Sequence, residues 1–400
     1  MFRYLTTGES HGKAVTAVVE GLPANLEIEP KDINKELARR QGGYGRGGRM
    51  KLENDQVEIL SGIRANQTLG SPVTFQIKNK DWNNWQEIMS PEGDGGYNKE
   101  EVIIEKDEKV KEVTPKVTKP RPGHADLAGS LKYDQEDIRN ILERASARET
   151  TGRVAVGAVA KKLLQEFGIK VISHVVQLGS VKADEQELTF VEIDNQVDDS
   201  PVRTLDQKAE TKMIEEIKQA KKTGDSLGGV FEIVTTPLPV GLGSHVQWDR
   251  KLDGRLAQAL MSIQAIKGIE VGLGFASSGR PGSKVHDEIY YHDGRFQHQT
   301  NNAGGLEGGM TNGEPLRLRA AMKPIPTLYK PLESVDLETK EKFKASVERS
   351  DVTAVPAAGV VGEAVVAIEL AKAWLEKFGG DSMAEIKQNY KNYIQSLEQR

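Results

Sequence analysis

Glycine is the residue that most constrains this chain, because it is abundant and gathered into a few stretches. The 400 residues include 40 glycines, well above the roughly 7% of an average protein. They cluster at residues 42–48, 93–96, 268–282 and 304–313, and no period of 20 to 50 residues recurs. Solenoid and propeller architectures are therefore excluded. The clusters instead predict turns and ligand-binding loops between regular elements.

Between the glycine clusters, patterns typical of helices and of strands follow one another. The segment 32–41, with Asp32 as its candidate cap, predicts a helix that runs directly into the first glycine cluster. A second helix is predicted to start at the cap Asp134, and a long apolar helix starts at Pro356, which suits a first turn. The segments QVEILSG and SPVTFQI alternate like strands. The chain is therefore predicted to mix α and β elements.

Charge balance and the absence of cysteine exclude several functions. The 54 basic and 59 acidic residues give a net charge of -5, which argues against general binding to nucleic acid or to an anionic membrane. Without cysteine there is no disulfide, thiolate metal site or cysteine nucleophile. The seven histidines are scattered, so no metal site is predicted. No signal peptide and no uninterrupted apolar span is seen, so we expect a cytoplasmic protein.

Two short motifs resemble nucleotide-binding loops but lack the required context. The segment GYGRGG matches the dinucleotide pattern GxGxxG, which needs a strand before it and a helix after it. Here a predicted helix precedes the glycines and a predicted strand follows them. The segment GESHGK resembles a P-loop, but Gly8 and Gly12 enclose three residues where a P-loop has four. Neither site is predicted.

Two other functional classes remain as alternatives. GESHG fits GxSxG, which makes Ser10 a candidate nucleophile of a serine hydrolase. Only seven residues precede Gly8, however, whereas a nucleophile elbow follows strands of an existing sheet. An RNA-binding module is suggested by GRGGR, although this box occurs once, in an acidic chain.

Arginines that accompany the glycines indicate an anion pocket. Guanidinium groups match the geometry of phosphates and carboxylates, and neighbouring glycines let backbone donors approach. His11 and His124, each in a glycine-containing turn, could supply a proton near neutral pH. The arginines concerned are Arg39, Arg40, Arg46, Arg49, Arg121, Arg144 and Arg148.

Five segments together resemble the signature segments of the chorismate synthase family, in the order found in that family. They are GESHG at 8–12, RRQGGYGRGGRM at 39–50, RPGHAD at 121–126, RASARET at 144–150 and RSDVTAVPAAGVVGEA at 349–364. The resemblance runs from residue 4 to about residue 374. It departs from the family at Pro326, where the family often has a small hydroxyl residue.

The resemblance implies a fold and a reaction. The fold would be a single α+β domain over residues 1–400, a β-α-β sandwich with antiparallel sheets packed on central helices. Two stretches lie outside the resemblance: the mixed charges of 86–119 predict a surface insertion, and the polar tail 376–400 predicts a C-terminal surface helix. The family's reaction is the 1,4-anti elimination of phosphate from 5-enolpyruvylshikimate 3-phosphate to give chorismate. This is a carbon–oxygen lyase step of the shikimate pathway, which leads to aromatic amino acids. It uses reduced FMN without net redox change.

Partners are also implied. NADPH would be a candidate source of reducing equivalents, delivered by a separate flavin reductase, and the assembly would be a homotetramer that binds neither nucleic acid nor membrane.

Roles carry over residue by residue from the resemblance. His11 would protonate the departing phosphate, His124 would hold or protonate the reduced flavin, and Asp351 would help remove the ring proton; the two histidine roles could be exchanged. Substrate anions would be bound by Arg39, Arg40, Arg46, Arg49, Arg121 and Arg148, and a nicotinamide cofactor by Arg40 and Arg46. FMN would contact Arg144, Ala145, Ser146, Gln264, Ala265, Gly308, Lys323, Pro324, Ile325, Pro326, Thr327 and Arg349.

Overall fold

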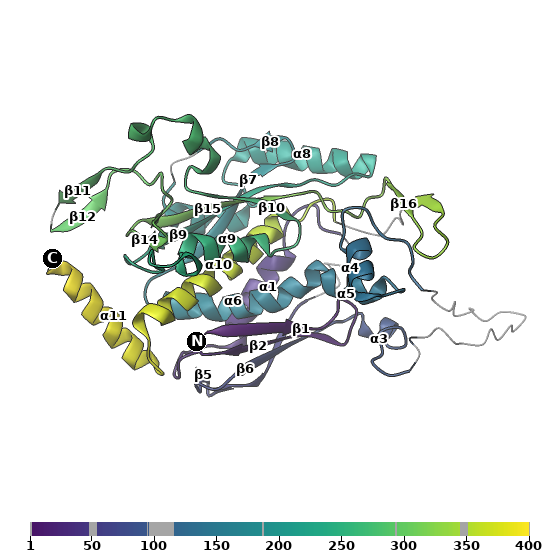
Figure 1. Cartoon of the computed structure of the whole chain (residues 1–400), viewed down its shortest axis with the longest axis horizontal. Coiled ribbons are helices and arrows are strands. Elements are labelled where there is room, and N and C mark those ends of the chain that lie inside the picture. Colours follow the sequence, from purple (N-terminus) through teal and green to yellow (C-terminus); the bar gives the residue numbers. More distant parts are fainter. Residues whose placement is uncertain are drawn as a thin grey trace, which may run out of the picture.

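Two antiparallel sheets enclose a layer of helices in the part of the chain that the computed structural model describes, which is residues 2–47, 54–93, 95, 116–185, 188–292, 294–344 and 351–399 (Figure 1). The first sheet has the strand order β1 (Arg3–Thr7), β2 (Ala14–Glu20), β6 (Val73–Lys78), β3 (Val57–Ser61). The second has the order β10 (Ile266–Val271), β15 (Pro315–Met322), β9 (Gly229–Pro237), β7 (Val171–Leu178), β8 (Val181–Lys182). Helices α1 (Pro30–Gln41), α6 (Thr150–Gln165), α9 (Leu252–Met261) and α10 (Val355–Phe378) form the layer. The predicted α+β sandwich is confirmed.

The other described elements lie at the ends and edges of this sandwich. They are β4 (Ile63–Arg64), β5 (Gln67–Thr68), α3 (Trp82–Trp85), α4 (Asp126–Tyr133), α5 (Arg139–Ala145), η1 (Ala147–Glu149), α7 (Phe190–Gln196), η2 (Val197–Asp199), α8 (Gln207–Thr223), η3 (Trp248–Arg250), η4 (Gly274–Gly279), η5 (Gly282–Lys284), β11 (Ile289–His292), β12 (Arg295–His298), β13 (Leu306–Glu307), β14 (Met310–Thr311), β16 (Glu333–Val335), β17 (Lys342–Lys344) and α11 (Met383–Glu398). Most of the predicted insertion at 86–119 lies outside the described residues.

Helix α10 is apolar on nearly every side because it lies between α6 and the five-stranded sheet. It begins at Val355 with Pro356 in its first turn, as predicted. Glycine at 379 follows its last turn. Across the described residues, no helix has both the length and the hydropathy needed to cross a bilayer.

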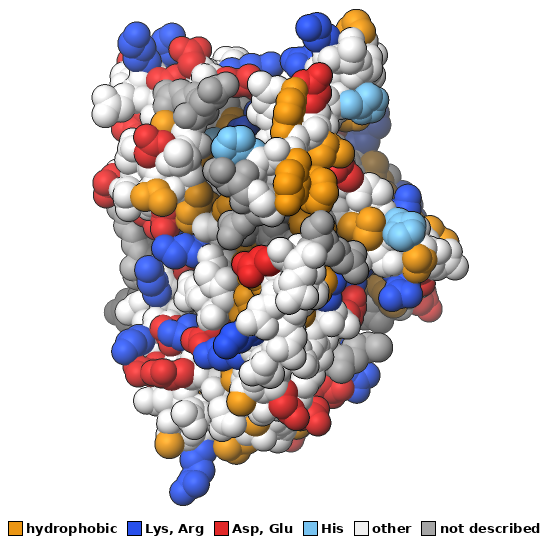
Figure 2. Space-filling model, turned by 90° about the vertical axis from the view of Figure 1, so that its left-hand side faces the viewer, with side chains coloured by type: hydrophobic (Ala, Val, Ile, Leu, Met, Phe, Trp, Pro, Cys, Tyr) orange, Lys and Arg blue, Asp and Glu red, His pale blue; other side chains and the backbone are white. Residues whose placement is uncertain are grey.

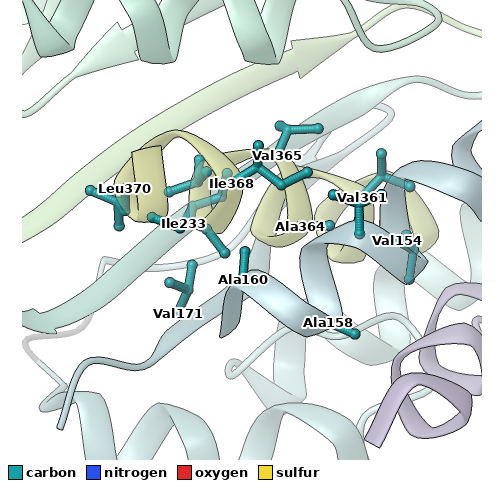
Figure 3. Close-up of a cluster of buried hydrophobic side chains, with 14 of the residues drawn as sticks. Val154, Ala158, Ala160, Val171, Ile233, Val361, Ala364, Val365, Ile368 and Leu370 are labelled. Atoms are coloured by element: carbon teal, nitrogen blue, oxygen red, sulfur yellow. The ribbon is translucent and has the colours of Figure 1, made fainter. Parts of the chain in front are cut away.

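The contact between α6 and α10 depends on small residues. Figure 3 shows alanine and valine side chains of both helices, among them Ala160 and Ala364, meeting in one buried cluster. A Cβ on Gly157 would lie 2.4 Å from the Cβ of Ala364 and 2.6 Å from its Cα. Because two backbones meet here, neither side can give way by changing a rotamer.

Gly157→Ala is therefore expected to lower the free energy of unfolding by about 1–3 kcal/mol through overpacking, as measured by urea denaturation. The matched control is Gly254→Ala in α9, where a Cβ would meet nothing within 4 Å. That change should stabilise the protein by roughly 0.5–1 kcal/mol, since alanine loses less backbone entropy in a helix. Unchanged stability in Gly157→Ala would contradict the close approach.

A cluster of charged side chains crosses the helix layer, centred on the fully buried Glu363 of α10. Arg39 of α1 donates two hydrogen bonds to its carboxylate at 2.7 and 3.0 Å, and Lys161 of α6 donates one at 2.5 Å. Ser173 of β7 donates to the same carboxylate through its backbone N–H at 2.9 Å and through its hydroxyl at 2.7 Å. Arg203, in the loop before α8, also donates to it at 3.1 Å. The cluster ties helices α1, α6 and α10 to the larger sheet.

Two predicted helix starts differ from the structure, and both differences concern capping residues. Helix α1 has Glu29 as its N-cap, and Asp32 is the third helical residue, whose carboxylate accepts the Glu29 backbone N–H at 2.9 Å. Asp134 ends helix α4 in the left-handed conformation with φ of 52° instead of starting the next helix, and α5 begins at Arg139. Aspartate adopts this conformation more readily than most residues, so it can close either end of a helix.

Candidate active site

The segment GESHG forms the turn of the first β-hairpin, between Thr7 of β1 and Ala14 of β2. Gly8 has φ of 97°, and a Cβ there would lie 2.2 Å from the carbonyl oxygen of Ala14. Only glycine fits this position. A strand and not a helix follows Ser10, so the geometry of a nucleophile elbow is missing and the hydrolase interpretation is wrong.

Helix α5 holds this turn in place from one side. The Glu143 carboxylate lies 2.7 Å from His11 Nδ1 and also accepts the His11 backbone N–H at 2.7 Å. The Glu143 carbonyl accepts the Ser10 N–H at 3.1 Å. Arg144 donates to the carbonyl oxygens of Gly8 at 3.1 Å and Thr6 at 2.6 Å. The RASARET segment therefore positions the GESHG turn, and Ser146 continues this contact through its hydroxyl, 3.2 Å from that of Ser10.

Two arginines bind one buried carboxylate next to this turn. Asp55 accepts Arg40 at 2.8 Å and Arg148 at 2.7 Å, and all three side chains are buried. Burial lowers the pKa of Arg40 to about 10, with repulsion from Arg148 and Arg46 acting in the same direction and Asp55 opposing them. The Nε atoms of Arg40 and Arg46 are buried and have no hydrogen-bond partner among the described residues. The positive charge is thus only partly balanced, as expected for a site that receives an anion.

The glycine-rich loop after α1 lies against the start of α10. Arg46 is 3.1 Å from the Asp351 carboxylate, which also accepts the Gly47 N–H, and the Val352 N–H donates to the Gly45 carbonyl at 2.9 Å. The loop follows a helix, so the order of a dinucleotide-binding unit is absent. Arg46 and Asp351, far apart in sequence, are brought together here.

The RPGHAD segment forms its own ion cluster at the start of α4. Asp126 accepts Arg121 at 2.9 Å and contacts His124 Nδ1, and Arg121 lies 3.2 Å from the same nitrogen. Burial alone would raise the pKa of Asp126, but the hydrogen bonds from His124 and Arg121 hold it well below its usual range. Asp126 thus stays ionised and orients both side chains.

The segment 323–327 joins RPGHAD to the start of the larger sheet. Lys323 donates to the Gly123 carbonyl at 2.6 Å through its side chain and to the Ala265 carbonyl at 2.9 Å through its backbone. Pro326 and Thr327 line a small cavity with Arg121. The remaining residues of this segment, Pro324 and Ile325, lie between these contacts.

Gln264 extends the same chain of contacts to the centre of the sandwich. Its amide donates to Glu149 at 3.3 Å, and Glu149 accepts the Thr6 hydroxyl at 2.7 Å. The side-chain amide oxygen of Gln264, Oε1, is buried and has no hydrogen-bond partner among the described residues. Helices α3, α4 and α5, which flank these contacts, lie together at one end of the sandwich (Figure 1).

Not every sequence-predicted residue joins this end. Arg39 turns into the Glu363 cluster instead. Gly308 lies in the β13–β14 turn, next to Gly309, whose carbonyl accepts the N–H of Leu252 at the start of α9. Gln264 follows the end of that ten-residue helix, about 15 Å away along its axis. Arg49 and Arg349 lie outside the described residues.

A large cavity lies elsewhere in the described structure, over the outward face of the five-stranded sheet. It has a volume of about 1020 Å³, and its polar lining includes His174, Glu232, Arg317 and Arg319. None of the sequence-predicted site residues lines it. Its acidic and basic side chains are intermixed, and Glu232 already pairs with its histidine and arginine neighbours. The cationic end of the sandwich is the better candidate site.

Sequence reasoning missed the residues that hold the arginines and histidines. Asp55, Glu143 and Asp126 each receive charged or imidazole groups, and Asn79 joins the Arg148 Nε at 2.8 Å to the Gly12 carbonyl at 2.7 Å. Only Asp126 lies in a recognised segment, RPGHAD. Because the partners of the others lie between 15 and 132 residues away in the chain, no local pattern marks them.

The fold and the site define an α+β protein with a buried arginine cluster and two carboxylate-bound histidines. The family model described as chorismate synthase matches residues 2–375, and the chain belongs to this family. It is 58% identical to the chorismate synthase of Geobacter metallireducens, with 99% of each chain covered, and 59% identical to that of Desulforamulus reducens, with 100% of each covered. A crystal structure of chorismate synthase matches with a TM-score of 0.79 at 43% identity, covering 100% of this chain and 99% of that one. The chain is therefore an enzyme of this family.

Proposed function

We propose that the enzyme converts 5-enolpyruvylshikimate 3-phosphate to chorismate by 1,4-anti elimination of phosphate, as a carbon–oxygen lyase. The observation that carries this proposal is the Arg40–Asp55–Arg148 cluster beside Arg46, with two buried guanidinium nitrogens lacking acceptors among the described residues. Two carboxylates and a phosphate give the substrate a charge of about -4. In a chain with a net charge of -5, such a substrate needs this local concentration of cations.

Reduced FMN fits the same end of the sandwich. The unpartnered Gln264 carbonyl oxygen offers an acceptor for a ring N–H, and Lys323 with the segment up to Thr327 offers cationic and backbone groups beside it. When bound, the reduced flavin supplies electron density that eases phosphate loss and is returned as the hydrogen leaves. We also propose that a separate flavin reductase delivers the reducing equivalents, with NADPH as their candidate source, so that the purified protein alone should not oxidise NADPH. Following NADPH oxidation by the purified protein tests this.

The chain's own residues would bind the substrate and the flavin and would transfer protons. Arg40, Arg46 and Arg148 would hold the substrate anions, and His11 would give a proton to the departing phosphate. His124, oriented by Asp126, would hold the flavin, and Asp351 would help accept the ring proton. Water would be excluded by the closely packed hairpin turn and loop around them.

The direct test is anaerobic turnover. Protein mixed with reduced FMN and 5-enolpyruvylshikimate 3-phosphate should release one phosphate for each chorismate formed, and oxidised FMN should give no product. Absence of chorismate under these conditions would refute the proposal. Because no nucleophile elbow is present, a fluorophosphonate should not label Ser10.

Inorganic phosphate should stabilise the protein by accepting hydrogen bonds from the unpartnered Nε atoms of Arg40 and Arg46. At a concentration 100 times the dissociation constant the gain is about 2.7 kcal/mol, measured as a rise in the thermal midpoint that shrinks with added NaCl. Arg46→Gln should reduce this rise, whereas Lys182→Gln, beside the large outer cavity, should not. An equal rise in both variants would mean that phosphate acts nonspecifically.

We also propose a homotetramer, supported by apolar side chains on the β11–β12 hairpin. Ile289, Tyr291 and Phe296 are 66%, 62% and 69% exposed. Figure 2, which views the end of the molecule that bears this hairpin, shows hydrophobic side chains gathered on the surface. Exposed apolar patches mark association sites. Light scattering should give a mass four times that of the chain, and a monomeric mass would contradict the proposal.

A further inference from the structure

The His11 side chain is held by one carboxylate through two different bonds. The two oxygens of Glu143 face His11 Nδ1 and the His11 backbone N–H, each at 2.7 Å. The Glu143 side chain is 2% exposed, whereas that of His11 is 18% exposed. The carboxylate is thus withdrawn from solvent behind the imidazole, in the position of a group that acts on the ring and not on a ligand.

The face of the imidazole is fixed as well as its edge. Trp85 of α3 stacks on it, with ring centroids 4.1 Å apart and an interplanar angle of 25°. The Trp85 indole N–H donates to Asp81 at 3.0 Å, which holds the indole in turn. A protonated imidazole next to an aromatic face gains cation–π attraction. Glu143 in the ring plane and Trp85 on the ring face together leave the imidazole one orientation.

We propose that Glu143 is a positioning residue that keeps the proton of His11 on Nδ1, so that Nε2 is the atom that exchanges a proton with the substrate phosphate. This rests on the proposed function. A neutral imidazole carries one N–H, and the hydrogen bond made by one nitrogen decides which nitrogen keeps it. With Nδ1–H donated to Glu143, proton transfer falls to Nε2.

The proton transfer balances without help from another group. The imidazolium gives its Nε2 proton to a phosphate oxygen as the carbon–oxygen bond breaks, and the bond electrons leave with phosphate. Nε2 keeps its lone pair, and His11 becomes the neutral Nδ1–H form. Glu143 accepts the same hydrogen bond before and after, and it does not itself take up the proton, like the aspartate of a serine protease triad.

The second histidine offers an internal comparison. Asp126 also contacts Nδ1 of His124, but it binds Arg121 through both of its oxygens, at 2.9 and 3.2 Å. Its charge is therefore shared with a permanent cation, whereas both Glu143 oxygens are directed at His11. Both oxygens of Glu143 are thus available to orient its histidine, whereas Asp126 also binds an arginine.

Nitrogen NMR of histidine-labelled protein tests the inference without turnover. Signals of His11 are assigned by their loss in His11→Gln, and the tautomer is read at a pH where the ring is neutral. The native protein should show the Nδ1–H form. Glu143→Leu, which has no acceptor, should change it to the Nε2–H form that neutral imidazole prefers in water, and the His124 signals should stay in place.

Turnover of the same variants supplies the second readout. Glu143→Leu should lower kcat by about 10–100-fold with KM for the substrate unchanged. Glu143→Gln keeps an acceptor for Nδ1–H but loses the charge and the acceptor for the His11 backbone N–H. Its kcat should therefore lie between that of the native protein and that of Glu143→Leu. Glu143→Asp, which restores the carboxylate, should recover more activity than Glu143→Gln.

The control is Glu232→Gln, which breaks a remote carboxylate–histidine pair with His174 at 3.1 Å. It should alter neither the His11 signals nor kcat. If His11 keeps the Nδ1–H form in Glu143→Leu, or if this variant keeps the native kcat, the inference is overturned. A tautomer change in a protein that makes no chorismate would support the positioning of His11 while refuting the proposed function.

Discussion

Replacing His11 with alanine is expected to lower kcat for chorismate formation by about 10²- to 10⁴-fold, the range that a positioned proton donor contributes. Phosphate leaves poorly unless it is protonated or neutralised, and Asn79 links the His11 turn to Arg148, one of the arginines that would hold it. His124→Ala should also lower the rate. Single-turnover measurements with pre-reduced FMN isolate this step from flavin reduction.

The fold must survive for that result to be informative. His11→Ala leaves the buried Glu143 without its imidazole partner, which costs stability in its own right. His11→Asn is the matched variant, because its amide N–H can replace Nδ1–H as a donor but cannot transfer a proton. Both variants should lose the same activity per folded molecule. Native turnover in His11→Asn would remove His11 from the mechanism.

Glu363→Ala is expected to lower the free energy of unfolding by about 3–5 kcal/mol, because it leaves Arg39, Lys161 and Arg203 buried without their shared carboxylate. Denaturation in urea measures the loss. Glu376→Ala on the same helix is the control: its ion pair with Arg255 is 57% exposed on the Glu376 side, and such pairs contribute about 0–1 kcal/mol. Equal losses in the two variants would contradict the central role of Glu363.

The same cluster predicts how stability depends on pH. Burial alone would raise the pKa of Glu363, but the charges of Arg39, Lys161 and Arg203 lower it well below its ordinary value. A carboxyl with a depressed folded-state pKa stabilises the fold above its unfolded pKa of about 4.3 and loses this contribution as the pH falls below it. Unfolding between pH 5 and 2, monitored for native protein and Glu363→Gln, should show a steeper loss in the native protein.

The sequence predicts the elements of this fold better than their partners. The helix from Pro356 and the mixed α and β character follow from local patterns, and both are confirmed. The strand order of the larger sheet, β10-β15-β9-β7-β8, does not follow the chain order. It depends on pairings between distant segments, which no local pattern contains.

Arg39 and Arg40 illustrate the same limit in the site. They are neighbours in one motif, and nothing in their sequence separates their roles. On a helix, however, consecutive side chains point about 100° apart, so Arg39 reaches Glu363 while Arg40 reaches Asp55. The sequence therefore identifies the cationic segment, and only the geometry of α1 divides its arginines between the interior and the pocket.

The central position of α10 also determines when the chain can fold during its synthesis. Its residues 355–378 pack between α6 and the five-stranded sheet, whose strands come from residues 171–322. Since a chain grows by about 5–20 residues per second, this sheet is synthesised before the helix that covers its inner face. We expect cooperative folding only after nearly the whole chain is made, with chaperones shielding the uncovered strands until then. A polypeptide stopped before residue 355 would carry both histidines and most of the arginines, but it would lack the helix that covers the inner face of the larger sheet.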